Sequence, residues 1–171
     1  MARQRRWKVP EDHPVGFYHC ISRVVDRQFL FGPAEKEHFV SLMRELEEFC
    51  EVQVLTYAVM DNHFHVLVAV PHRPQKLPTA EDILAKLKRL SGHQDAGAAL
   101  QALERCRKDD NADGEARWLE RYYARMWDVS AFMKLLKQRF TQWYNGTKGR
   151  KGTLWEERFK SVLVEEGPAL A

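Results

Sequence analysis

The chain has 171 residues, 44% hydrophobic and 30% charged, and its net charge of +3 gives no global argument for a polyanionic partner. This length suits one domain with a buried core, and no stretch approaches the ~20 apolar residues of a membrane-spanning helix or forms a signal peptide, so we expect a cytoplasmic protein without a membrane partner. The three cysteines form no Cys-x-x-Cys pair, which disfavours a zinc or redox site of that type.

The first half of the chain predicts the opening of an antiparallel sheet. Residues Phe17–Val25 are rich in aromatic and β-branched side chains, which favours a strand. Apolar residues then recur at helical spacing from Pro33 to about Cys50. Two further strands are expected at Val52–Tyr57 and Phe64–Val70. The order strand, helix, strand, strand is typical of a ferredoxin-like layer.

The second half predicts a helical insertion followed by a helix and a strand. After several prolines, the sequence at about 72–127 is charged, rich in alanine and helical in character. Ser130 is a suitable N-cap for a helix that would end at Asn145-Gly146, and Leu154–Val164 predicts the last strand. We therefore expect one α+β domain over residues 1–171, with helices packed on an antiparallel sheet and a helical insertion; the final residues, 165–171, could begin another helix.

Basic residues gather in two segments of the chain. They are Arg3, Arg5, Arg6 and Lys8 at the N-terminus, and Lys148, Arg150 and Lys151 in a glycine-containing turn. Each cluster alone is more often a solvated surface than a binding site. Together with the flanking aromatic residues Trp143, Tyr144 and Trp155, the second cluster could contact the phosphates and unpaired bases of a nucleic acid, although tryptophan is more often buried.

The sharpest local feature is the pair His63 and His65. Because side chains alternate along a strand, both imidazoles should lie on one face while Phe64 enters the core. Two nitrogen donors side by side can hold part of the coordination shell of a divalent metal. In isolation a His-x-His pair is more often structural. A nucleotide hydrolase would need a third alternate histidine, and that position is Leu67.

Four ordered segments together resemble the REP-associated tyrosine transposases of the HUH (His-hydrophobic-His) class. The segments are Tyr18–Arg23, Met60–Val68, Lys137–Asn145 and Gly152–Ser161. The resemblance implies a ferredoxin-like HUH fold that acts on single-stranded or hairpin DNA by strand cleavage and rejoining, as a monomer or homodimer. It implies that His63 and His65 bind Mg²⁺ or Mn²⁺ and that a tyrosine is the nucleophile. Arg23, Arg158 and Lys160 lie in the matching segments and join the two basic clusters as expected DNA-binding residues.

The expected nucleophile does not match any tyrosine of the chain well. In the family it lies on a helix after the strand that corresponds to Arg158–Ser161, whereas this chain reaches Ala171 without a tyrosine there. Tyr144 is a weak substitute, because its fourth neighbour Lys148 is a poor metal ligand. We expect DNA binding without nicking if the protein ends at Ala171, and strand transfer if it is longer. A non-catalytic, possibly regulatory, DNA-binding derivative is the alternative, and a phosphoesterase for small nucleotides is disfavoured.

Overall fold

A four-stranded antiparallel sheet forms the centre of the molecule. The computed structural model describes residues 13–164, apart from the side chains of residues 91–95. In chain order the elements are β1 (Val15–Arg23), the short 3-10 helix η1 (Val25–Arg27), α1 (Pro33–Cys50), β2 (Gln53–Val59), β3 (His63–Pro71), α2 (Ala80–Lys108), α3 (Ala112–Tyr123), α4 (Val129–Lys148) and β4 (Lys160–Val164). The strands lie in the order β2-β3-β1-β4, which is the ferredoxin-like arrangement expected from the sequence.

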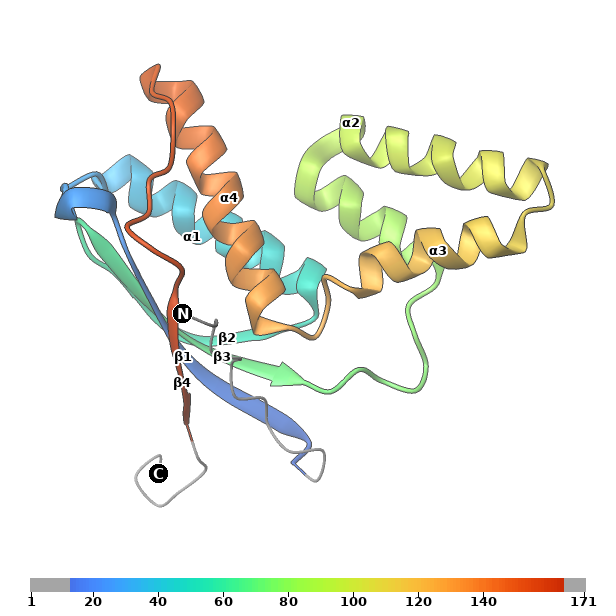
Figure 1. Ribbon diagram of the computed structural model, residues 1–171, viewed down its shortest axis with the longest axis horizontal. Helices are drawn as coiled ribbons and strands as arrows, with labels where there is room; N and C mark the ends of the chain where they lie inside the picture. Colours follow the sequence, from blue (N-terminus) through green and yellow to red (C-terminus); the bar gives the residue numbers. More distant parts are fainter. Residues whose placement is uncertain (1–12, 165–171) are drawn as a thin grey trace, which may run out of the picture.

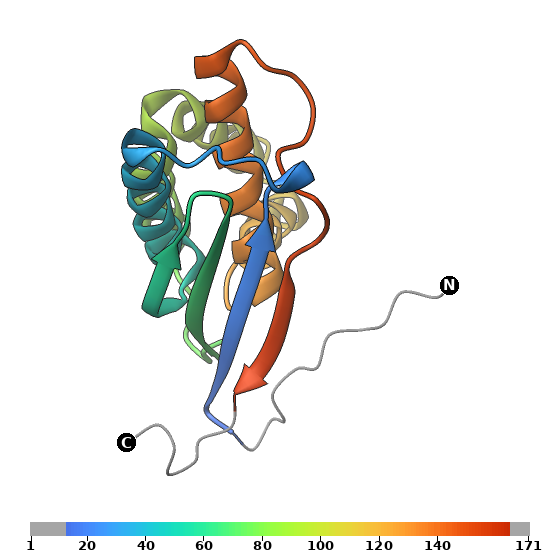
Figure 2. The ribbon, with the colours of Figure 1, turned by 90° about the vertical axis from the view of Figure 1, so that its left-hand side faces the viewer.

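The two faces of the sheet differ in what covers them. Helices α1 and α4 lie on the same face, as Figure 1 and Figure 2 show. In the part of the chain that the structure describes, no helix lies on the other face, which we call the open face. The central strands β1 and β3 pair along their whole length, with Val15 opposite Pro71 and Arg23 opposite His63. Side chains opposite one another in this register share a face.

The core fills the space between the sheet and the two helices. Strands β1 and β3 alternate between buried and partly exposed residues, which is the pattern of a sheet with one packed face. Phe64 of β3, Phe39 of α1 and Phe140 of α4 meet with ring centroids 4.6 Å (Phe39 to Phe64) and 5.2 Å (Phe39 to Phe140) apart. This packing fixes the face of Phe64, so its neighbours in β3 must point to the open face.

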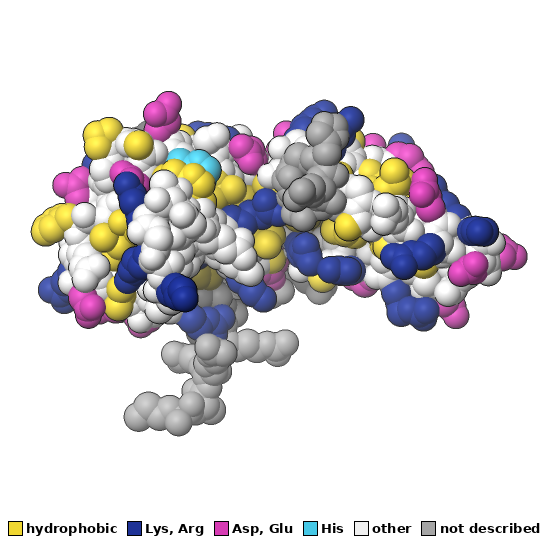
Figure 3. Space-filling view, turned by 90° about the horizontal axis from the view of Figure 1, so that it is seen from above, with side chains coloured by type: hydrophobic (Ala, Val, Ile, Leu, Met, Phe, Trp, Pro, Cys, Tyr) yellow, Lys and Arg dark blue, Asp and Glu magenta, His cyan; other side chains and the backbone are white. Residues whose placement is uncertain are grey.

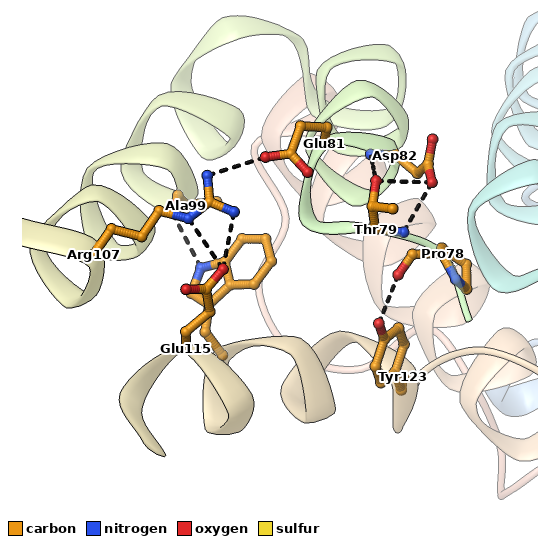
Figure 4. Close-up of polar contacts among 9 residues, drawn as sticks. Pro78, Thr79, Glu81, Asp82, Ala99, Arg107, Glu115 and Tyr123 are labelled. Atoms are coloured by element: carbon orange, nitrogen blue, oxygen red, sulfur yellow. Dashed lines mark hydrogen bonds and ion pairs between the residues drawn. The ribbon is translucent and has the colours of Figure 1, made fainter. Parts of the chain in front are cut away.

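Helices α2 and α3 form an arm that projects beside the sheet layer (Figure 1), within the range for which the sequence predicted a helical insertion. Figure 4 shows the contacts that join the two helices. Arg107 of α2 pairs with Glu81 and Glu115, while the Trp118 indole of α3 donates a hydrogen bond to the carbonyl oxygen of Ala99 at 3.1 Å. Basic and acidic side chains alternate over the arm in Figure 3, so this view shows no surface of one sign on it.

Several element boundaries differ from those that the sequence predicted. Asp128, not Ser130, caps α4, because its carboxylate accepts hydrogen bonds from the backbone amides of Ser130 and Ala131. The helix also continues through Asn145-Gly146 and ends at Gly149, whose φ of 62° suits glycine. The last strand begins at Lys160 rather than Leu154. The helix start considered for residues 165–171 lies outside the described residues. None of the helices in residues 13–164 has the length and apolar composition to cross a bilayer.

Candidate metal centre

His63 and His65 lie next to each other on the open face of the sheet. Their side chains are partly buried, whereas Phe64 between them is completely buried in the core. The centroids of the two imidazole rings are 5.2 Å apart, with the rings nearly perpendicular. The structure thus brings together two nitrogen-bearing rings at the beginning of β3, on a strand held on both sides by neighbouring strands.

Asn62 orients the ring of His63. The Nδ1 atom of His63 lies 2.7 Å from the side-chain oxygen of Asn62. The amide nitrogen of Asn62 donates to the carbonyl oxygen of Arg27 at 3.2 Å, which identifies the atom facing His63 as the oxygen. Nδ1 of His63 is therefore the donor and carries the proton. The lone pair of Nε2 is left to bind a metal.

His19 of β1 contacts the Nδ1 atom of His65, as Asn62 contacts the Nδ1 atom of His63. The Nε2 atom of His19 lies 3.0 Å from Nδ1 of His65, and the two rings stack at a centroid distance of 5.2 Å. When His65 donates from Nδ1, its Nε2 lone pair is also directed away from this contact. Sequence reasoning missed His19 as a site residue. Strand alternation could have placed it on one face of β1, but only the register of β1 with β3 brings it to His65.

The surroundings of His65 favour its neutral form. Burial lowers the pKa of His65 below its ordinary value, and the nearby His19, His63 and Arg23 lower it further. A neutral imidazole is the form that binds a metal. The lowered pKa of His65 therefore favours the form of this side chain that can bind a cation.

The donor set fits part of the coordination shell of a small divalent cation. Two imidazole nitrogens suit several divalent metals, Mg²⁺ being the harder ion that also requires oxygen ligands. In residues 13–164, no group of three or more histidine, cysteine, aspartate or glutamate side chains is arranged to hold a metal. Oxygen atoms of a phosphate or of water could complete the coordination shell.

None of the five tyrosines of the chain lies beside the histidines. All five are within the described residues. Tyr144, considered as a weak candidate nucleophile, is buried on α4, which lies on the helix side of the sheet, so it cannot reach a phosphate on the open face. Tyr18 faces the core, and Tyr57 lies under the guanidinium of Arg44 on the helix side. Tyr122 and Tyr123 belong to α3. Lys148 follows Tyr144 within the helix, not beyond its end as the sequence predicted.

Two of the expected DNA-binding residues, Arg23 and Lys160, lie on the same face of the sheet as the histidines. Arg23 lies opposite His63 in the sheet register, and Lys160 lies opposite Ile21 on the same face. Arg158 precedes β4 and is exposed. The backbone amide of Glu156 donates to the carbonyl oxygen of Arg23 at 3.1 Å, which holds this part of the connecting segment against the end of β1.

The other expected DNA-binding residues are not brought to the histidines by any contact that the structure describes. Lys148 forms an ion pair of 2.8 Å with Glu35, and this pair lowers the pKa of the glutamate carboxyl group. The positive charge of Lys148 is therefore balanced by the carboxylate of Glu35 in α1. Arg150 donates to the carbonyl oxygen of Thr153 at 3.3 Å, and Lys151 is exposed. The N-terminal cluster of Arg3, Arg5, Arg6 and Lys8 lies outside the described residues.

The sheet order and the paired histidines on its open face define an α+β protein of ferredoxin-like architecture with a potential metal centre. A family model described as "Transposase IS200 like" matches residues 15–126, more than half of the chain. The chain belongs to this family of IS200-like transposases.

Two solved structures are similar to this chain. One is a REP-associated tyrosine transposase bound to a REP hairpin, at 12% identity and a TM-score of 0.53 over 99% of this chain. The chain spans 66% of that protein. The other, described as a transposase of Deinococcus radiodurans R1, is 14% identical over 97% of this chain and 88% of its own, with a TM-score of 0.46. Comparison with curated proteins gave no match.

His19 is expected to act as a positioning residue for His65. Replacing it with alanine removes the partner of Nδ1 and should weaken Mn²⁺ binding roughly 10- to 100-fold, the usual cost of losing such a contact. His19→Gln, which supplies an acceptor oxygen, should recover part of the affinity. Calorimetric titration with Mn²⁺ measures this, and Leu67→Ala is the control, because Leu67 lies opposite His19 in the register. Equal losses in the alanine variants of His19 and Leu67 would rule out the assigned role.

Proposed function

We propose that this protein binds single-stranded or hairpin DNA across its open face and holds Mg²⁺ or Mn²⁺ with His63 and His65. Membership of the IS200-like transposase family supports a role in DNA strand cleavage and rejoining during transposition. The observation that carries the proposal is the pair of imidazoles on one strand, each with its Nδ1 atom in contact with a polar partner. Arg23 and Lys160 supply positive charge on the same face.

A bound cation would polarise the scissile phosphate and stabilise the charge that develops on it. The protein's own part is to orient the two imidazoles through Asn62 and His19 and to keep His65 neutral. Arg23 would contact a neighbouring phosphate from the end of β1. All five tyrosines of the chain lie away from the histidines, so the nucleophilic tyrosine that the family resemblance implies would have to come from outside these 171 residues or from another molecule.

Hairpin binding tests the proposal directly. Fluorescence anisotropy with the full 171-residue chain would compare a DNA hairpin carrying a single-stranded extension with a blunt duplex of the same stem sequence. The hairpin is expected to bind more tightly, with an affinity that falls as salt rises, because phosphate contacts release counterions. Equal affinity for the two DNAs would contradict recognition of hairpin or single-stranded DNA. Absence of binding to both would contradict DNA binding as such.

A second candidate function is DNA binding without strand cleavage. It is favoured by the placement of all five tyrosines away from the histidines. Incubation of the chain with Mn²⁺ and a 3′-labelled hairpin, followed by denaturing electrophoresis, distinguishes the two functions. A covalent protein-DNA adduct that disappears in His63→Ala would establish cleavage by this chain, whereas hairpin binding without an adduct supports the second function.

A further inference from the structure

A groove lies on the helix side of the sheet, between α4 and the segment that leads into β4. It has a volume of about 780 Å³. Figure 2 shows this segment descending beside α4 to the edge strand β4, on the side of the sheet away from β2. Its principal lining residues are Lys134, Lys137 and Gln138 of α4 and Trp155, Arg158 and Phe159 of the connecting segment. We call it the α4 groove.

One wall of the α4 groove is a polar stripe along α4. Lys137 and Gln138 lie three and four residues after Lys134, and Thr141 lies four and three residues after them, so the four side chains lie on the same side of the helix. Lys137 is only 9% exposed, and its ammonium group donates to the carbonyl oxygen of Glu157 at 2.7 Å. Because a buried cation is costly without a hydrogen-bond partner, this contact is what holds the ammonium group of Lys137 deep in the groove.

The opposite wall is aromatic and held in place. The indole nitrogen of Trp155 donates to the carbonyl oxygen of Lys137 at 3.1 Å and lies 2.9 Å from the hydroxyl oxygen of Thr141. Its ring packs edge-on against Phe64 at a centroid distance of 5.5 Å. Phe159 continues this wall. Trp155 and Phe159 are only 7% and 8% exposed, and the ammonium group of Lys137 lies 5.2 Å from the centroid of the Trp155 ring, so the two aromatic side chains form an apolar floor beside the cations and not a stacking surface.

The charges of the α4 groove favour an anionic ligand. Lys134 and Arg158 are exposed at the groove, and Lys137 lies below them. Glu157 is the acidic residue among those that line it, and its carboxylate is paired with Lys160 at 2.8 Å. The lining thus carries more positive than negative charge.

Arg23 connects the α4 groove with the histidines. Its carbonyl oxygen accepts from the amide of Glu156, and the next residue, Val24, forms a β-bridge with Trp155 of the groove wall. Its position in the register is opposite His63.

We propose that the α4 groove binds the sugar-phosphate backbone of one nucleotide of a single-stranded DNA segment, with the phosphate against Lys134 and Arg158 and the sugar over the apolar floor of Trp155 and Phe159. The strand then passes around the β4 edge beside Arg23 to the histidine pair. This inference rests on the proposed function, because it takes DNA to be the ligand. It adds a site for the single-stranded part of that DNA, separate from the open face.

Charge reversal at the groove rim tests the inference. The variant Lys134→Glu changes one exposed residue of the groove, and Lys88→Glu makes the same change of charge on the α2–α3 arm. Binding would be measured for a blunt hairpin and for the same hairpin with an oligothymidine extension of about ten nucleotides, within the usual range for single-strand sites. The groove variant should lose roughly tenfold or more of its affinity for the extended hairpin, while blunt-hairpin affinity and Mn²⁺ affinity stay close to wild type.

The outcomes separate the inference from the proposed function. The groove inference is wrong if the extension does not raise the affinity of the wild-type protein, or if the groove and arm variants lose this gain in affinity equally. Hairpin binding stands in both cases. If the wild-type protein binds neither DNA, the proposed function fails and the inference fails with it.

Photochemical cross-linking avoids substituting Trp155, which is part of the core. An extension containing 5-iodouracil is expected to cross-link to the peptide that contains residues 153–159, and the groove variant should suppress this product. Cross-links confined to the α2–α3 arm would overturn the assignment.

Discussion

Alanine substitution of both His63 and His65 is expected to lower Mn²⁺ affinity by more than about 100-fold, because both nitrogen donors are lost and even a supporting contact is worth 10- to 100-fold. Calorimetric titration of the full chain at neutral pH measures this. The stability of the fold should change little, since both rings lie at the surface of the open face and Phe64 keeps its place in the core.

The matched control removes two imidazoles elsewhere. His38 stacks on Trp143 at a centroid distance of 3.9 Å, and His72 is exposed near the end of β3. The double variant His38→Ala with His72→Ala should bind Mn²⁺ like the wild type. A similar loss in both double variants would show that the metal binds without preference among histidines.

Phe140→Ala is expected to destabilise the fold by about 3–5 kcal/mol, the usual cost of removing a buried phenylalanine. Its ring is almost completely buried and lies 5.0 Å from Phe31, 5.2 Å from Phe39 and 6.1 Å from Trp155, measured between ring centroids. The loss would leave a cavity between α1, α4 and the connecting segment. Urea unfolding followed by circular dichroism gives the change in the free energy of unfolding.

Phe29→Ala provides the comparison, because this ring is 79% exposed and its removal should change stability by less than about 0.5 kcal/mol. A Phe140→Ala variant no less stable than Phe29→Ala would mean that the aromatic cluster does not hold the helices to the sheet.

The fold could be predicted from the sequence where one periodicity dominates. Helix α1 begins at Pro33 and ends at Cys50 as predicted, because its apolar residues keep one helical face throughout. The end of α4 could not be placed in the same way. Asn145-Gly146 resembles a helix stop, yet the helix continues, with Tyr144 packed in the core and the amide nitrogen of Asn145 donating to the carbonyl oxygen of Gly152. Tertiary packing outweighed the local preference.

Only part of the candidate site could be predicted from the sequence, because the rest depends on contacts between residues that are distant along the chain. The alternation of β3 is a local property, so the shared face of His63 and His65 followed from their spacing. The contacts of His19 with His65 depend on the pairing of β1 with β3, which joins residues 46 positions apart. Lys134 and Lys137 gave a local signal, a polar stripe on a helix, but the groove that they line needs the segment at 153–159 beside it.

Manganese-induced broadening of the imidazole NMR signals tests the metal site most directly. The chain contains seven histidines, so labelling with ¹⁵N-histidine gives a small set of signals that can be assigned by single substitutions. At the lowest Mn²⁺ concentrations, the signals of His63 and His65 should broaden first and that of His19 next, while those of His38 and His72 remain sharp. Broadening that begins at His38 or His72, or that affects all rings equally, would contradict a metal centre on the open face.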